Sequence, residues 1–203
     1  MILLVDNYDS FTYNLHHYLS PFGEVIVRRN DAEDLLEIAE QADGIVFSPG
    51  PGRPEDAGEM KDLIARYAEL KPLLGICLGH QAIAQHYGGL ITQAKEIRHG
   101  KVSTMICQET DTLLKGLPQE FAIMRYHSLI LHPDTLPASL MVIGVATDDQ
   151  EIMALKHREL PVYGLQFHPE SIGTKYGQDL LKNFMTLIIE KEGTANGPIN
   201  EII

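Results

Sequence analysis

Short aliphatic runs alternate with segments of helical periodicity in the first part of the chain, and this alternation constrains the fold more than any other feature. Four runs have the length and composition of buried strands: Ile2–Val5, Glu24–Val27, Gly44–Phe47 and Leu73–Ile76. The segments between them, residues 11–19, 31–42 and 60–70, place apolar side chains on one face of a helix. Strands that are buried on both faces and separated by helices form a parallel sheet. We therefore expect an open, mostly parallel, twisted α/β sheet with helices on both faces.

The second part of the chain has a different pattern. Short strand-like pieces joined by turn-rich segments favour antiparallel pairing: Val102–Cys107, Ala122–Met124, Met141–Val145 and Ile152–Leu155. A further strand, Pro161–Phe167, precedes an apolar stripe from Tyr176 to Ile188 that predicts a final helix. Neither a repeat nor a linker divides residues 1–203, so we expect a single domain with a small antiparallel sheet and a frayed tail over residues 193–203.

A cysteine occupies the junction between the fourth strand and the helix after it. The sequence Gly75-Ile76-Cys77-Leu78-Gly79 overlaps the end of the apolar run and leads into Gln81-Ala82-Ile83-Ala84. Glycines two residues to either side let the backbone turn sharply and leave the side chain open to approach, as in a nucleophile elbow. The free N–H groups and the dipole at a helix start favour a thiolate. A small buried cysteine that ends a core strand is the alternative, and a second motif is needed to decide.

The second motif is His168-Pro169-Glu170, which also follows a predicted strand. In extended geometry, His168 and Glu170 leave the backbone on the same side. A histidine can accept the proton of a thiol, and a carboxylate on its other nitrogen fixes the tautomer and stabilises the imidazolium. Ligands of parallel α/β sheets bind beyond the carboxyl ends of the strands, where Cys77 also lies. The sequence therefore predicts a Cys77–His168–Glu170 catalytic triad, with a surface His-Pro-Glu turn as the alternative.

Composition argues against several other classes of protein. A formal net charge of −12 disfavours contact with the phosphate backbone of a nucleic acid. The two cysteines, Cys77 and Cys107, cannot form a disulfide framework, which suits a reducing compartment. Residues 1–6 lack the basic segment of a signal peptide, and no apolar run approaches the roughly 18 residues of a membrane span. We therefore expect a cytoplasmic protein that binds neither nucleic acid nor membrane.

Two other residues near the predicted triad have simpler interpretations. His80 lies at the start of the helix after Cys77, and its position directs it away from the thiol, which indicates a structural role. A zinc site built from Cys77, His80, His168 and Glu170 would lack the usual Cys-x-x-Cys or His-x-x-x-His pair. We expect no metal ligands in this chain.

Three separated motifs resemble, in order and spacing, the signatures of class I glutamine amidotransferases. They are Ser48-Pro49-Gly50-Pro51-Gly52-Arg53-Pro54, Gly75-Ile76-Cys77-Leu78-Gly79-His80-Gln81 and Gln166-Phe167-His168-Pro169-Glu170-Ser171. The segments Asp6–Asn14 and Arg125–Leu129 look like those of the amidotransferase subunits of anthranilate synthase and aminodeoxychorismate synthase. The resemblance covers nearly the whole chain and implies a flavodoxin-like sheet.

The resemblance implies a role for each motif. Cys77 would attack the side-chain amide of glutamine, His168 would pass a proton to the leaving ammonia, and water would release glutamate from a thioester. The backbone N–H groups of Gly50 and Leu78 would bind the oxyanion, and a glycine at position 50 allows close approach of the backbone. The implied substrate-binding residues are Gly50, Pro51, Gly52, Leu78, Gln81, Ser128 and Leu129.

The resemblance also implies a partner. A glutaminase without a synthase domain would deliver ammonia to a separate large subunit that binds chorismate and holds Mg²⁺, so we expect no cofactor in this chain. Arg53 after Gly52, and the segment Ser171–Thr174, look more like the anthranilate type, which serves tryptophan biosynthesis. An aminodeoxychorismate synthase subunit for folate biosynthesis, or a subunit shared by both synthases, is the first alternative. From other classes, a stand-alone γ-glutamyl cysteine hydrolase and a non-catalytic binding module remain open.

Overall fold

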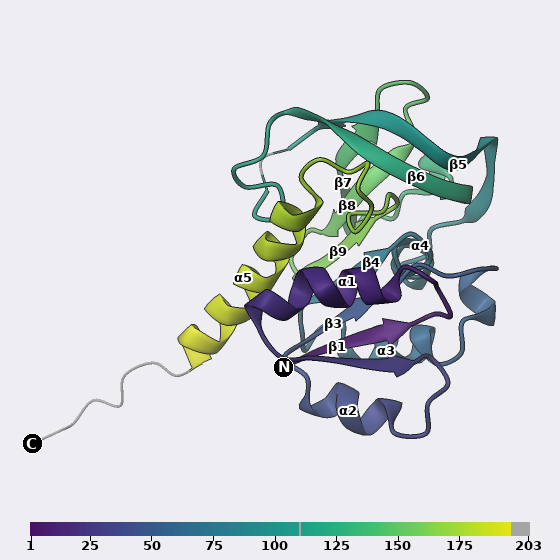
Figure 1. Ribbon diagram of the computed structural model, residues 1–203. Coiled ribbons are helices and arrows are strands. Elements are labelled where there is room, and N and C mark those ends of the chain that lie inside the picture. The colour runs from purple at the N-terminus through teal and green to yellow at the C-terminus, as the bar shows by residue number, and fades with distance from the viewer. Residues whose placement is uncertain (110, 196–203) are drawn as a thin grey trace, which may run out of the picture.

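The computed structural model describes residues 1–109 and 111–195 (Figure 1). The strands are β1 (Ile2–Asp6), β2 (Val25–Arg29), β3 (Gly44–Phe47), β4 (Leu73–Ile76), β5 (Ile91–Cys107), β6 (Glu120–Leu131), β7 (Leu140–Ala146), β8 (Ile152–His157) and β9 (Val162–Leu165). The α-helices are α1 (Thr12–Leu19), α2 (Leu35–Gln41), α3 (Met60–Tyr67), α4 (Leu78–His86) and α5 (Gly177–Ala195). Short 3₁₀ turns cover Ser20–Phe22, Pro54–Asp56 and Pro133–Thr135.

Within these residues the strands form one nine-stranded sheet in the order β2-β1-β3-β4-β9-β8-β7-β5-β6. The strands from β2 to β9 in this order pair in parallel, and β8, β7, β5 and β6 continue the same sheet in antiparallel pairing. The predicted α/β architecture is confirmed. The predicted antiparallel strands are joined to the parallel ones through β8, which pairs with β9.

Helices cover both faces of the parallel strands. Successive strand residues point to opposite faces, so neighbouring residues of one strand pack against different helices. Ile2 and Leu4 pack in one core cluster with side chains of α1 and α5, whereas Leu3 and Val5 pack in a second cluster with side chains of α2, α3 and α4. All four of these β1 side chains are buried. Strands buried on both faces explain why the aliphatic runs are continuous rather than alternating.

The two longest strands exceed the predicted pieces. β5 starts at Ile91 instead of Val102, and β6 covers Glu120–Leu131 instead of Ala122–Met124. Figure 1 shows them as a long twisted ribbon at one end of the sheet. The register between them shifts between Gln93 and Arg98 and again between His99 and Lys101. Bulges of this kind interrupt the alternation by which a sequence reveals a strand.

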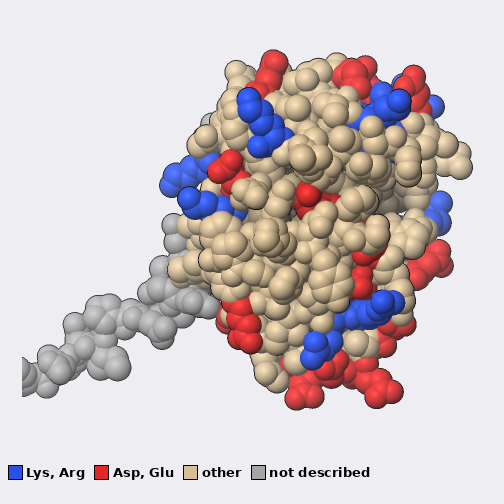
Figure 2. Space-filling model, in the orientation of Figure 1, with Lys and Arg blue, Asp and Glu red and all other residues tan. Residues whose placement is uncertain are grey.

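The C-terminal helix and the surface complete the description. Because α5 continues to Ala195, residues 193–195 of the expected tail are helical, and residues 196–203 lie outside the described residues. On the face seen in Figure 2, Lys and Arg side chains are dispersed among acidic ones rather than gathered in one patch. None of the helices in residues 1–109 and 111–195 combines the length and apolar character that a bilayer crossing requires.

Candidate active site

The carboxyl ends of four parallel strands meet at one edge of the sheet. Val5 lies opposite Phe47, Phe47 lies opposite Gly75, and Ile76 lies opposite Leu165. The residues that follow these strands therefore come together although they are far apart in sequence. Asn7, Ser48, Cys77 and Gln166 are all buried at this edge.

Cys77 sits on a strained turn between β4 and α4. Its backbone has φ 52° and ψ −97°, a conformation that residues other than glycine rarely adopt. A Cβ on Gly75 would lie 2.3 Å from the carbonyl of Gly79, so the strand and helix approach too closely for any side chain there. The Cys77 N–H donates to the carbonyl of Leu165 at 2.7 Å, which ties the turn to β9. This geometry matches the predicted elbow.

His168 and Glu170 form a buried pair beside Cys77. The His168 Nδ1 lies 2.7 Å from Glu170 Oε1, and each residue is only 3% exposed. Burial alone lowers the pKa of His168, but interactions with the Cys77 sulfur and the Glu170 carboxylate outweigh it and raise the pKa to about 10. His168 Nε2 has no hydrogen-bond partner of normal geometry in the described part of the chain. The arrangement favours an imidazolium next to the sulfur.

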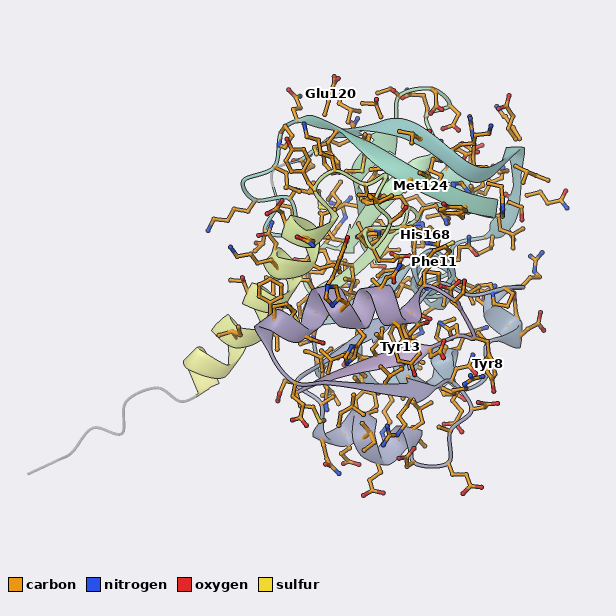
Figure 3. All side chains as sticks on the ribbon, in the orientation of Figure 1. Tyr8, Phe11, Tyr13, Glu120, Met124 and His168 are labelled. Atoms are coloured by element: carbon orange, nitrogen blue, oxygen red, sulfur yellow. The ribbon has the colours of Figure 1, made fainter. Side chains whose placement is uncertain are left out.

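Aromatic rings enclose the imidazole. The ring centroid of Tyr126 is 5.1 Å from that of His168, and the Phe11 centroid is 6.4 Å away in an edge-on orientation. Figure 3 shows Phe11 reaching from the start of α1 towards His168. The Tyr126 carbonyl is also 3.9 Å from Cys77 Sγ and can accept a hydrogen bond from the thiol. The rings therefore restrict the access of water to the imidazole.

A cavity of about 200 Å³ opens next to the sulfur. Its walls come from the loop after β3, the start of α4 and the end of β6: Gly50, Pro51, Gly52, Cys77, Leu78, Gln81, Tyr126, His127, Ser128 and Leu129. All seven predicted substrate-binding residues line this one cavity, whereas His168 and Glu170 do not. The roles of these seven residues in substrate binding stay predictions, but the structure does bring the seven residues together around one cavity.

Gln166 belongs to the site, although the sequence assigned it no role. Its Nε2 lies 3.6 Å from Cys77 Sγ, and its Oε1 accepts a hydrogen bond from Gln81 Nε2 at 3.2 Å. Gln81 Nε2 also donates to the carbonyl of Leu129 at 2.9 Å. Gln81 therefore links α4 to β6 and to the residue that follows β9. The position of Gln166, two residues before His168, is the signal that could have identified it.

His80 is fully buried against the backbone of Gly164. Burial outweighs a backbone interaction with Gly164 and lowers the pKa of His80 to about 4. A neutral, packed imidazole near pH 7 agrees with the structural role expected for His80. Burial, together with the charge of Arg125, also lowers the pKa of His127 to about 3.

A buried arginine supports the strand that forms one wall of the cavity. Arg125 is 0% exposed, and its guanidinium contacts Glu151, Asp149 Oδ2 at 2.9 Å and Asp148 Oδ1 at 3.3 Å. Its Nε also donates to His127 Nε2 at 3.1 Å. The sequence did not indicate this cluster, because the carboxylates that pair with Arg125 lie more than 20 residues away in the chain.

Across residues 1–109 and 111–195, no group of three or more His, Cys, Asp or Glu side chains is placed to hold a metal ion. Cys107 lies outside the site, where its thiol is 3.7 Å from the carbonyl of Pro118.

Comparison with known proteins gives consistent matches. A family model described as "Glutamine amidotransferase class-I" matches residues 3–188. Anthranilate synthase component 2 of Azospirillum brasilense is 53% identical over 96% of this chain and 100% of its own length. Aminodeoxychorismate/anthranilate synthase component 2 of Bacillus subtilis is 46% identical over 91% of this chain and 95% of its own. The crystal structure of a putative GMP synthase component from Thermoplasma acidophilum superposes with a TM-score of 0.86 at 26% identity, covering 96% of each chain.

Proposed function

Because this chain belongs to the class I glutamine amidotransferase family, we propose that it is the glutaminase subunit of an anthranilate synthase. It hydrolyses L-glutamine to glutamate and delivers the ammonia to a synthase subunit that uses chorismate. The observation that carries this proposal is the meeting of the buried His168–Glu170 pair with Cys77, at a cavity lined by every predicted binding residue.

The geometry supports the following chemistry. The Cys77 thiolate attacks the side-chain carbonyl carbon of glutamine, and the carbonyl oxygen becomes an oxyanion. His168, as the imidazolium favoured by its raised pKa, protonates the amide nitrogen, so the C–N bond breaks and ammonia leaves. Neutral His168 then takes a proton from water as the hydroxyl attacks the thioester. The C–S bond breaks, glutamate leaves and the thiolate is restored.

Two backbone N–H groups are proposed to bind the oxyanion. Leu78 begins α4 immediately after the nucleophile, and Gly50 lies in the loop opposite. A Cβ on Gly50 would be 2.9 Å from Leu78 Cδ2, so the two segments are adjacent. Each such donor contributes about 3 kcal/mol to the stability of the transition state. Gln81 and the backbone of Ser128 and Leu129 then hold the amino and carboxylate ends of glutamine.

A partner subunit is proposed because ammonia released into water at neutral pH is protonated and diluted. The relatives support this, since they are named as component 2 of a synthase. Exposed apolar side chains lie close to the triad: Phe11 is 37% exposed and Ile172 99%. Phe11 and Ile172 also line a cavity of about 380 Å³ that reaches Glu170. We place the contact with the large subunit here, and assign the Mg²⁺ of the synthase reaction to that subunit.

The anthranilate assignment has one close alternative. The Bacillus relative is named as component 2 of both aminodeoxychorismate synthase and anthranilate synthase. Arg53 after Gly52 and the Ser171–Thr174 segment favour the anthranilate type. We therefore keep tryptophan biosynthesis as the proposed pathway and let the experiment decide between the synthases.

Reconstitution tests the proposal. The purified chain is mixed with the large subunit of either anthranilate synthase or aminodeoxychorismate synthase, and glutamine-dependent product is measured. Cys77→Ser is expected to abolish the product, whereas Cys107→Ser, which changes a thiol outside the site, is expected to retain it. Both products with wild type would indicate a shared subunit. Glutamine cleavage by the lone chain, without product from either complex, would overturn the proposal in favour of a stand-alone hydrolase.

A further inference from the structure

We propose that Asn7 is a positioning residue that holds the oxyanion loop, defined here as residues 48–52, in its catalytic conformation. Asn7 follows β1 directly and is 2% exposed. It does not line the cavity beside Cys77, so its effect must be transmitted through the loop. The inference rests on the proposed function, because it concerns the donor that Gly50 supplies.

Asn7 binds the first residue of the oxyanion loop twice. Its backbone N–H donates to Ser48 Oγ at 2.8 Å, and its side-chain Nδ2 donates to the Ser48 carbonyl at 2.8 Å. The Ser48 hydroxyl in turn donates to the carbonyl of Pro49 at 2.7 Å. Ser48 is fully buried, so water does not compete for these bonds. The loop is therefore fixed up to the peptide bond that precedes Gly50.

Asn7 also packs directly against Gly50. A Cβ added to Gly50 would lie 2.6 Å from Asn7 Cβ and 2.6 Å from the Asn7 carbonyl oxygen. The Gly50 backbone thus cannot move towards β1 unless Asn7 moves first. A hydrogen-bond donor stabilises an oxyanion only when its direction is set in advance, and displacement by about 1 Å can cost 10²-fold in rate.

Asn7 is itself fixed by a second asparagine. Asn30 Nδ2 donates to Asn7 Oδ1 at 3.0 Å, and Asn7 Nδ2 lies 3.3 Å from Met60 Sδ. Asn30 is tied to the backbone on both sides, because its N–H donates to Asp6 and its carbonyl accepts from Glu59 at 2.8 Å. The Asn7 amide oxygen is occupied as an acceptor, so the nitrogen must face Ser48.

The test replaces Asn7 with aspartate, which has nearly the same shape but no donor. In Asn7→Asp a carboxylate oxygen faces the Ser48 carbonyl, so the loop is pushed away from its position. We expect kcat for glutamine hydrolysis in the complex with the large subunit to fall by about 10- to 100-fold. KM for glutamine is expected to stay unchanged, since the oxyanion exists only along the reaction path. Ser48→Ala removes only the hydroxyl and should lower kcat in the same way.

Asn183 supplies a matched control. Its Nδ2 donates to two loop carbonyls, those of Leu113 at 3.0 Å and Lys115 at 2.9 Å, so it performs the same kind of loop attachment on α5. Asn183→Asp is expected to leave kcat unchanged. A second readout is alkylation of Cys77 by iodoacetamide, located by peptide mass mapping, because this reaction forms no oxyanion. Its rate should be the same in Asn7→Asp and wild type, as should product formation from added ammonium salt.

The outcomes separate the inference from the proposed function. A fall in kcat with constant KM and constant alkylation rate supports Asn7 as a positioning residue. An unchanged kcat, or equal losses in kcat, alkylation and ammonia-dependent synthesis, overturns it. If Asn7→Asp does not fold, Ser48→Ala decides by the same criteria. Retention of glutamine-dependent activity by Cys77→Ser would instead refute the proposed function, and the inference with it.

Discussion

Acidification should destabilise this protein, and a defined part of the loss comes from His80, which the catalytic chemistry does not use. His80 is fully buried, and burial lowers its pKa from the ordinary 6.5 to about 4. Between these two values the unfolded chain binds a proton at His80 while the folded chain does not. The free energy of unfolding therefore falls as the pH drops from 6.5 towards 4. Above pH 7, His80 is neutral in both states and has no such effect.

The magnitude follows from the size of the pKa change. A gap from 6.5 to about 4 corresponds to about 3 kcal/mol once the pH lies below both values. Between pH 7 and pH 5, most of the proton uptake by the unfolded state has occurred and the folded state is still nearly unprotonated. The part of the loss due to His80 over this interval is about 2 kcal/mol.

Urea unfolding at pH 7 and at pH 5 measures this contribution. Wild type and His80→Gln are compared, because the titration of every other group then largely cancels in the difference. The loss of unfolding free energy between the two pH values should be about 2 kcal/mol greater for wild type than for His80→Gln. His17→Gln, at an exposed position on α1, is the control and should follow wild type. Equal losses in wild type and His80→Gln would refute the reasoning.

Three further substitutions test other parts of the structure. Arg125→Met leaves the buried carboxylate of Glu151 without its arginine, and should reduce the free energy of unfolding by about 3–5 kcal/mol in urea titrations. Glu170→Gln removes the charge beside Nδ1, so the pKa of His168 should fall from about 10 in an NMR titration, with a loss of kcat on the order of 10²-fold. Gly79→Ala places a Cβ 2.7 Å from the Cβ of Phe47, the last residue of β3. This substitution should reduce the free energy of unfolding by about 1–3 kcal/mol in the same urea assay.

Each of these predictions has a result that would contradict it. Arg28→Met breaks the partly exposed pair with Asp34 and should cost less than about 1 kcal/mol. A loss in Arg125→Met as small as this would show that burial of the Arg125 cluster does not increase its contribution to stability. A constant pKa of His168 in Glu170→Gln would mean that the carboxylate does not stabilise the imidazolium. Wild-type stability in Gly79→Ala would show that α4 is free to move away from β3.

The features that could be predicted from the sequence are those with local causes. Runs such as Ile2–Val5 predict strands buried on both faces, and the glycines around Cys77 predict a sharp turn. The spacing of His168 and Glu170 likewise predicts that their side chains leave the backbone on the same side. The first half of β5 escaped prediction because it is a polar strand with bulges, in which Ile97 is 75% exposed. Its pairing depends on β6 rather than on a buried face of its own.

The buried polar clusters could not be predicted because their members come from distant segments. Arg125 is buried only because the residues around Asp149 and Glu151 fold over it. Asn7 is a turn-forming residue in the sequence, and its role depends on Ser48 and Asn30 lying beside it. A polar side chain can be buried when its hydrogen bonds are satisfied, and local sequence does not reveal which partners will arrive.

The relation between the nucleophile and its base depends on one long-range strand pairing. β4 and β9 pair in parallel with Ile76 opposite Leu165, and the Cys77 N–H donates to the Leu165 carbonyl at 2.7 Å. β8 holds β9 from the other side, since the N–H of Gln166 donates to Met153 at 2.8 Å. A register slip of one residue would bring the apolar side chain of Phe167 to the position of Gln166 and carry His168 away from the sulfur. The antiparallel strands therefore contribute to the site although they supply neither the nucleophile nor its base, because they fix the register on which the triad depends.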